Sequence, residues 1–127
     1  MGRYQKDIFM FNSRNIIAAI LAGIAGTIAN SIAVSAALGA PLLDLIFSFG
    51  REAVAILVAL LLIPIFARME GAAAWLTGFL TLAIVPSILA KTIFAVPAGW
   101  TMVLIVNAVY AITAVIVYVL ITKRTAA

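Results

Sequence analysis

Four charged residues lie in or beside the apolar stretches of this chain, and they are the first candidates for chemistry. Arg51 and Glu52 are adjacent and directly precede an apolar run over residues 53–67. Lys91 lies near the end of the next apolar run, and Asp44 lies shortly before Arg51. A charge in hydrocarbon is costly and as a rule has a partner or a task. These residues predict either ion pairs that hold helices together or a site for a polar solute or an ion.

Their expected depth follows from the rise of a helix, about 1.5 Å per residue. Counted from Arg68, Arg51 lies about 25 Å along its span, and Lys91 lies about 28 Å along the following one. Both heights fall near the outer boundary of a hydrocarbon core of about 30 Å. We expect a Glu52–Lys91 contact, or a cluster of both with Arg51. Asp44 is expected to cap Arg51 from outside.

Four neutral polar residues also interrupt the apolar stretches, namely Asn30, Ser31, Ser87 and Asn107. Asn30 lies about 22 Å from the inner end of its span, and Ser87 lies at a similar height. Asn107 lies about 10 Å below the outer edge, which is the same level within one turn. The sequence therefore predicts a polar layer below a charged rim. Such a layer fixes the register of the helices by hydrogen bonds, worth about 0.6 kcal/mol each, or lines a water-filled vestibule. A third alternative is a groove that a protein partner occupies.

The elements that must position these residues are membrane spans. Of the 127 residues, 67% are hydrophobic and 9% are charged, whereas a soluble domain has roughly 25% charged residues. Four apolar stretches each approach the roughly 20 residues that cross a bilayer. The prediction is a single all-α domain, an integral membrane four-helix bundle with short loops, with spans at about 15–38, 44–67, 72–94 and 100–121.

The basic residues predict the orientation of the bundle. When the spans alternate, one side collects Arg3, Lys6, Arg14, Arg68, Lys123 and Arg124. The other side carries only the turns at 39–41 and 97–99. Because cytoplasmic loops are rich in Lys and Arg, both termini are expected in the cytoplasm.

The first span carries small residues at intervals of four. One row contains Ala18, Ala22 and Gly26, and a second contains Gly23 and Thr27. Small side chains let helix backbones approach closely in membranes. We expect these five residues to pack helices and the first span to be the most enclosed.

The residue types also exclude much chemistry. The chain has no His and no Cys, which removes the commonest general base, the commonest metal ligand and all thiolate sites. No phosphate-binding glycine loop and no catalytic carboxylate pair is present. We expect no enzymatic activity, no cofactor and no bound metal. The basic residues mark the ends of spans, so no nucleic-acid partner is expected.

Three short motifs carry a family resemblance: Gly26-Thr27-Ile28-Ala29-Asn30, Pro41, and Pro86-Ser87. With these motifs the chain resembles a family of small bacterial four-helix membrane proteins known only as a domain of unknown function. The resemblance implies the four-span topology and a bacterial source, and it implies no activity. For a bacterial multi-pass protein, the expected location is the inner (plasma) membrane. The Arg51-Glu52 pair has no counterpart in the family pattern.

Two functions are consistent with these observations. The first is a non-enzymatic membrane protein that self-associates or serves as an accessory subunit, with the lipid bilayer, a second copy or another membrane protein as partner. The alternative is a small oligomeric transporter or channel, in which the outward-facing polar cluster handles a polar solute or an ion.

Overall fold

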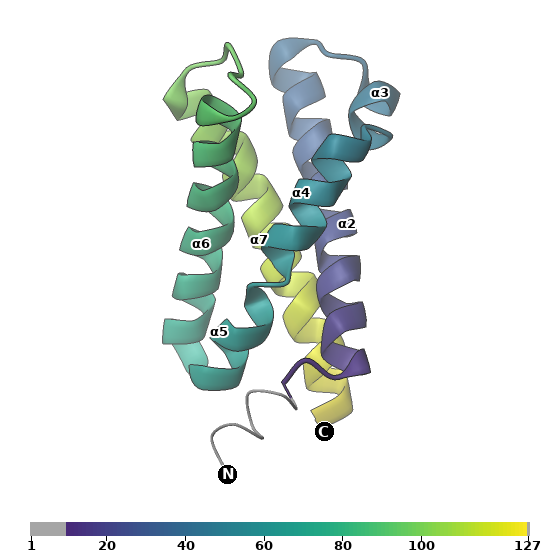
Figure 1. The fold of residues 1–127 in the computed structure, drawn as a ribbon, viewed down its shortest axis with the longest axis vertical. Helices are drawn as coiled ribbons and strands as arrows, with labels where there is room; N and C mark the ends of the chain where they lie inside the picture. Colours follow the sequence, from purple (N-terminus) through teal and green to yellow (C-terminus); the bar gives the residue numbers. More distant parts are fainter. Residues whose placement is uncertain (1–9, 127) are drawn as a thin grey trace.

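The computed structural model describes residues 10–126, with side chains as far as residue 122, and this part of the chain is entirely helical apart from short connections. The beginning of the first helix and the end of the last lie at one end of the bundle, here called the terminal end (Figure 1). The connections at residues 39–48 and 93–99 lie at the other, here called the turn end. The helices are α2 (Ser13–Leu38), α3 (Leu42–Ile46), α4 (Phe49–Ala59), α5 (Leu62–Arg68), α6 (Gly71–Thr92) and α7 (Trp100–Ala126).

Four segments of the described chain are long and apolar enough to cross a membrane. This confirms the prediction of a four-helix membrane bundle and makes the chain a multi-pass membrane protein. Three spans begin and end within two residues of the predicted bounds. The second begins five residues later than predicted. The observed spans are Ser13–Leu38, Phe49–Arg68, Gly71–Thr92 and Trp100–Thr122.

The late start of the second span is due to α3, a separate short helix. Pro41 precedes its first residue with extended backbone angles, where a proline without an N–H costs nothing. The chain is extended again at Ser48, which precedes α4. This bend places the backbone carbonyl of Leu45 beside α4, where it becomes part of the polar site described below.

The second span is also broken near its middle, between α4 and α5. Pro64 has no N–H, and in a continuous helix its ring would collide with the carbonyl of Leu60. The backbone here forms hydrogen bonds between residues three apart instead of four. The N–H of Leu61 donates to the Val58 carbonyl at 3.0 Å, and the N–H of Ile63 donates to the Leu60 carbonyl at 3.1 Å. The span therefore changes direction here, as Figure 1 shows.

Helix α2 is the most buried of the four spans and packs against both α7 and α4. A Cβ added at Gly23 would lie 2.9 Å from the carbonyl oxygen of Ala55 and 2.9 Å from the Cα of Ile56. A Cβ at Gly26 would lie 2.6 Å from the ring of Tyr110. The small residues thus bring α2 into backbone contact with its neighbours. All five predicted packing residues are buried, namely Ala18, Ala22, Gly23, Gly26 and Thr27.

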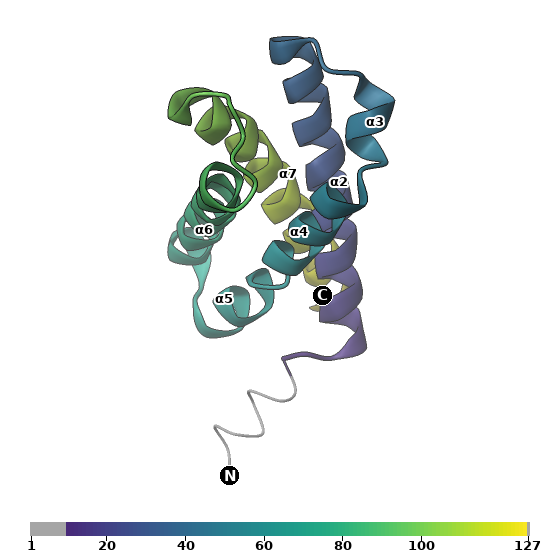
Figure 2. The same ribbon diagram turned by 45° about the horizontal axis from the view of Figure 1, so that its top comes forward.

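The remaining helices are arranged around this core. Helix α6 packs along α7, and α5 contacts α6 at the terminal end. Toward the turn end α4 lies away from α6, as both ribbon views show (Figures 1 and 2). The change of direction at Leu60–Leu61 produces this divergence, which leaves room between α4 and α6 for the site.

Candidate functional site

A chain of side-chain hydrogen bonds joins all four spans in the half of the bundle near the turn end. Arg51 of α4 donates from Nη2 to Asn30 Oδ1 of α2 at 2.5 Å. Asn30 Nδ2 donates to Asn107 Oδ1 of α7 at 3.1 Å. Asn107 Nδ2 donates to Ser87 Oγ of α6 at 2.9 Å. The structure thus brings together Asn30, Ser87 and Asn107, which the rise per residue of a helix predicted to lie at the same depth.

Asn30 is the centre of this network. Its side chain is buried, and Nδ2 also donates to the backbone carbonyl of Val106 at 2.8 Å. An amide offers two donor hydrogens and one acceptor oxygen, and all three are used here. At the far end of the network, Ser87 donates to the carbonyl of Ala83 at 2.6 Å. Because its amide is fully engaged, Asn30 has a fixed orientation and holds the Arg51 guanidinium in place.

Arg51 is half-buried, and in the described part of the chain its hydrogen bonds reach only neutral groups. Besides Asn30, Nη2 donates to Ser31 Oγ at 3.2 Å, and Nε donates to the carbonyl of Leu45 at 3.3 Å. A guanidinium has five N–H donors, and the two on Nη1 reach no described residue. The positive charge is therefore held in place without a hydrogen-bonded carboxylate.

The predicted contact between Glu52 and Lys91 was wrong. Lys91 Nζ donates instead to the backbone carbonyls of Val96, at 3.0 Å, and Ala98, at 2.6 Å. Glu52 Oε2 is buried and has no hydrogen-bond partner among the described residues. The physical reason is that α4 and α6 diverge at the turn end. Lys91 therefore meets the loop that folds back over the end of its own helix.

Asp44 was expected to cap Arg51 from outside. It lies exposed on α3, and α3 reaches Arg51 through a different group, the carbonyl of Leu45. The role expected of a charged side chain is thus taken by a backbone oxygen, and α3 supplies no carboxylate to Arg51.

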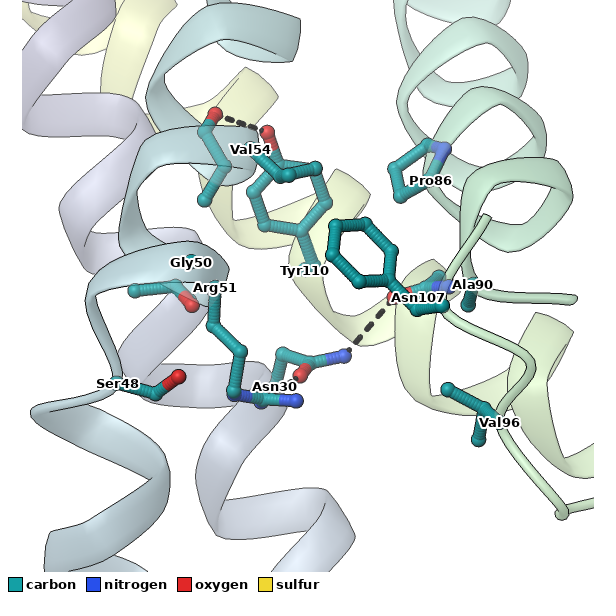
Figure 3. Close-up of a pocket in the computed structure, with 13 residues that line it drawn as sticks. Asn30, Ser48, Gly50, Arg51, Val54, Pro86, Ala90, Val96, Asn107 and Tyr110 are labelled. Carbon is teal, nitrogen blue, oxygen red and sulfur yellow. Dashed lines mark hydrogen bonds between the residues drawn. The ribbon is translucent and has the colours of Figure 1, made fainter. Parts of the chain in front are cut away.

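Beside the guanidinium lies a partly open cavity of about 320 Å³ between α2, α4, α6, α7 and the loop after α6. In Figure 3, Arg51, Ser48 and Asn30 occupy one side, and Pro86, Ala90 and Val96 face them from the other. The lining residues are Thr27, Asn30, Ser48, Gly50, Arg51, Val54, Ala55, Pro86, Ala90, Phe94, Val96, Asn107 and Tyr110.

Tyr110 is a lining residue that sequence reasoning missed. Its ring is buried, and its O–H donates to the carbonyl of Ala55 at 2.6 Å, which ties α7 to α4 (Figure 3). Residues three apart on a helix share a face, so its spacing from Asn107 was a usable signal. Phe94 and Val96 were missed because they belong to a loop whose path no periodicity reveals.

Comparisons of the chain with protein-family models, with curated proteins and with solved structures give no match. The resemblance carried by residues 26–30, Pro41 and residues 86–87 stays a prediction. Fold and site together define the class: a multi-pass membrane protein with an arginine on the wall of a cavity near one end of its bundle.

Proposed function

We propose that the protein is a small, non-enzymatic transporter or binding protein of the bacterial inner membrane that recognises an anionic group of its ligand at Arg51. One observation carries the proposal. A fixed guanidinium, whose hydrogen-bond partners among the described residues are all neutral, lines a cavity that a ligand can enter. Ionisable groups inside membrane spans mark functional sites by default, and their usual tasks are solute and ion pathways.

The chemistry of arginine favours an anionic group as the ligand. The guanidinium stays charged in proteins and presents its donors in a planar fork that fits carboxylate or phosphate oxygens. Nη1 reaches no described residue, so its two donors are available. Because Asn30 and Ser31 already orient the group, binding loses little side-chain entropy. The cavity volume of about 320 Å³ lies at the lower end of the range of small-molecule sites, about 300–1,000 Å³.

The transporter form of the proposal is oligomeric, because a bundle of 127 residues with a well-packed α2–α7 core leaves no room for a pore of its own. The other expected role, as a self-associating or accessory subunit, rested on the small-residue rows of the first span and on the absence of catalytic groups. These rows pack against α4 and α7 of the same chain. They are therefore occupied within the chain, any association between copies must use other faces, and the anion-binding function is preferred.

The test is a thermal-shift measurement on the purified protein in zwitterionic detergent micelles. The probes are inorganic phosphate, sulfate and acetate, with acetamide, which has the shape of acetate but no charge, as the control. A ligand at 100 times its Kd stabilises the folded state by about 2.7 kcal/mol, which raises the Tm measurably. We expect the anions to raise the Tm of the wild type and of Arg14→Gln, a charge removal at the terminal end.

Arg51→Gln should abolish this increase, and Arg51→Lys, which keeps the charge but not the fork, should retain part of it. The lysine variant also serves if the glutamine variant fails to fold. Equal anion-dependent increases in the wild type and in both Arg51 variants would refute recognition at Arg51, as would the absence of any increase.

A further inference from the structure

The cavity beside Arg51 has two unlike walls. Arg51, Asn30 and Ser48 make one wall polar, whereas Pro86, Ala90 and Val96 make the facing wall apolar (Figure 3). A fully hydrated ion would place its water shell against the apolar wall, which offers water no hydrogen bonds. An amphiphile, with a charged head and a hydrocarbon chain, matches both walls at once.

The surroundings of the cavity are apolar too. Phe94 lines the cavity and is 54% exposed. Phe47 and Phe49, on either side of the lining residue Ser48, are 78% and 85% exposed. The entrance of a vestibule for a hydrophilic solute would be expected to carry polar side chains. Exposed phenylalanines at this end are instead what hydrocarbon chains of the bilayer would contact.

The height of Arg51 in the span fits a lipid headgroup. The second span begins at Phe49, so Arg51 lies within its first turn, at the edge of the hydrocarbon core. Phosphate groups of membrane lipids lie just outside that edge. The free Nη1 donors of Arg51 and a lipid phosphate therefore occupy compatible depths, and their charges are complementary.

From these observations we propose that the ligand is an anionic membrane lipid, with its phosphate at Arg51 and one hydrocarbon chain along the apolar wall formed by Pro86 and Ala90. The inference rests on the proposed function and adds the ligand class to it. The lipid reaches the site from the bilayer, through the space that the divergence of α4 from α6 leaves at the turn end.

The experiment measures the association of spin-labelled lipids with the protein in phosphatidylcholine vesicles by electron paramagnetic resonance. Spin-labelled phosphatidylglycerol is compared with spin-labelled phosphatidylcholine that carries the same chains. Since hydrogen bonds to charged groups contribute strongly, we expect at least about a tenfold preference for the anionic lipid at one site per chain. Arg51→Gln should remove this preference and Arg14→Gln should retain it.

Ala90→Phe separates the lipid from a free anion, because it fills the apolar wall and leaves Arg51 in place. It should reduce the lipid preference several-fold, which is a larger factor than its effect on the affinity for phosphate measured by thermal shift. Ala90→Leu, a smaller change, serves if the phenylalanine variant is unstable.

The outcomes separate the two proposals. Phosphate binding that depends on Arg51, with no lipid preference or with one that neither Ala90 variant reduces, overturns the lipid inference and leaves the proposed function standing. If neither the phosphate-induced increase in Tm nor the lipid preference depends on Arg51, both proposals are overturned.

Discussion

At the scale of single residues, the surroundings of Arg51 distinguish a binding group from a structural ion pair. In a structural ion pair, the guanidinium would be hydrogen-bonded to a carboxylate on a neighbouring helix. Here Asn30, Ser31 and the carbonyl of Leu45 orient the guanidinium and leave its charge uncompensated by hydrogen-bonded carboxylates among the described residues. Neutral partners fix an arginine without competing for an anionic ligand.

Glu52 provides a test at this scale, because it is the nearest acidic residue in sequence and its Oε2 has no hydrogen-bond partner among the described residues. Its negative charge opposes an anion at Arg51. Glu52→Gln should therefore strengthen anion binding by about fivefold, since an interaction on the order of 1 kcal/mol is removed. The measurement is a phosphate titration followed by thermal shift. Glu70→Gln, at the terminal end, is the control and should leave the affinity unchanged. An affinity equal to that of the wild type in both variants would place Glu52 outside the electrostatic field of the site.

At the scale of elements, two close contacts of α2 hold the site together. Gly23 meets the backbone of α4, and Gly26 meets Tyr110 of α7. Asn30 lies one turn beyond Gly26 and, from that position, reaches both α4 and α7. The distance between these helices, and with it the geometry of the network, depends on the absence of side chains at the two glycines.

Gly23→Ala should destabilise the bundle by about 1–3 kcal/mol, the usual cost of overpacking, because the new Cβ would collide with backbone atoms that cannot move aside. Gly50→Ala is the matched control. It lies in α4 with nothing within 4 Å of the added Cβ, and alanine favours a helix by up to about 1 kcal/mol over glycine. Unfolding in mixed micelles with increasing dodecyl sulfate measures both. Equal stability of the two variants would show that α2 and α4 are not in backbone contact.

Sequence reasoning predicted the four spans because a run of about 20 apolar residues has one low-cost conformation in lipid. It also predicted the common level of Asn30, Ser87 and Asn107, since helix rise converts residue number into depth. It could not predict the partner of Lys91, because depth does not give the direction in which a side chain points around its helix. That direction depends on the divergence of α4 from α6.

Two local features of the second span could not be predicted from the sequence for a similar reason. The sequence shows Pro64, but the position of the break, at Leu60–Leu61, follows from the carbonyl that the proline ring excludes one turn earlier. The short helix α3 has the same apolar composition as the span it precedes, so hydropathy joins the two. Both features shape the cavity, which is why its lining was only partly predicted.

At the scale of the whole molecule, the orientation of the bundle decides which leaflet the cavity faces. The start of α2 and the end of α5, which carry Arg14 and Arg68, lie at the terminal end together with the last turns of α7 (Figure 1). The lining residues place the cavity toward the turn end. Arg3 and Lys6 lie outside the described residues, and the side chains of Lys123 and Arg124 are not described. The prediction of cytoplasmic termini therefore rests on the sequence, and it places the cavity at the outer leaflet.

The absence of cysteine from the sequence permits a clean test of this orientation. Gly99→Cys introduces a thiol in the exposed loop at the turn end, where nothing lies within 4 Å of an added Cβ. Glu70→Cys introduces one in the exposed loop at the terminal end. In intact bacterial spheroplasts, a membrane-impermeant maleimide should label Gly99→Cys, and it should label Glu70→Cys only after permeabilisation. The reverse pattern would turn the cavity to the cytoplasm, and equal labelling would mean that both orientations are inserted. With the expected pattern, Arg51 can draw its lipid only from the outer leaflet, so an impermeant reductant added outside should quench a nitroxide-labelled lipid bound there.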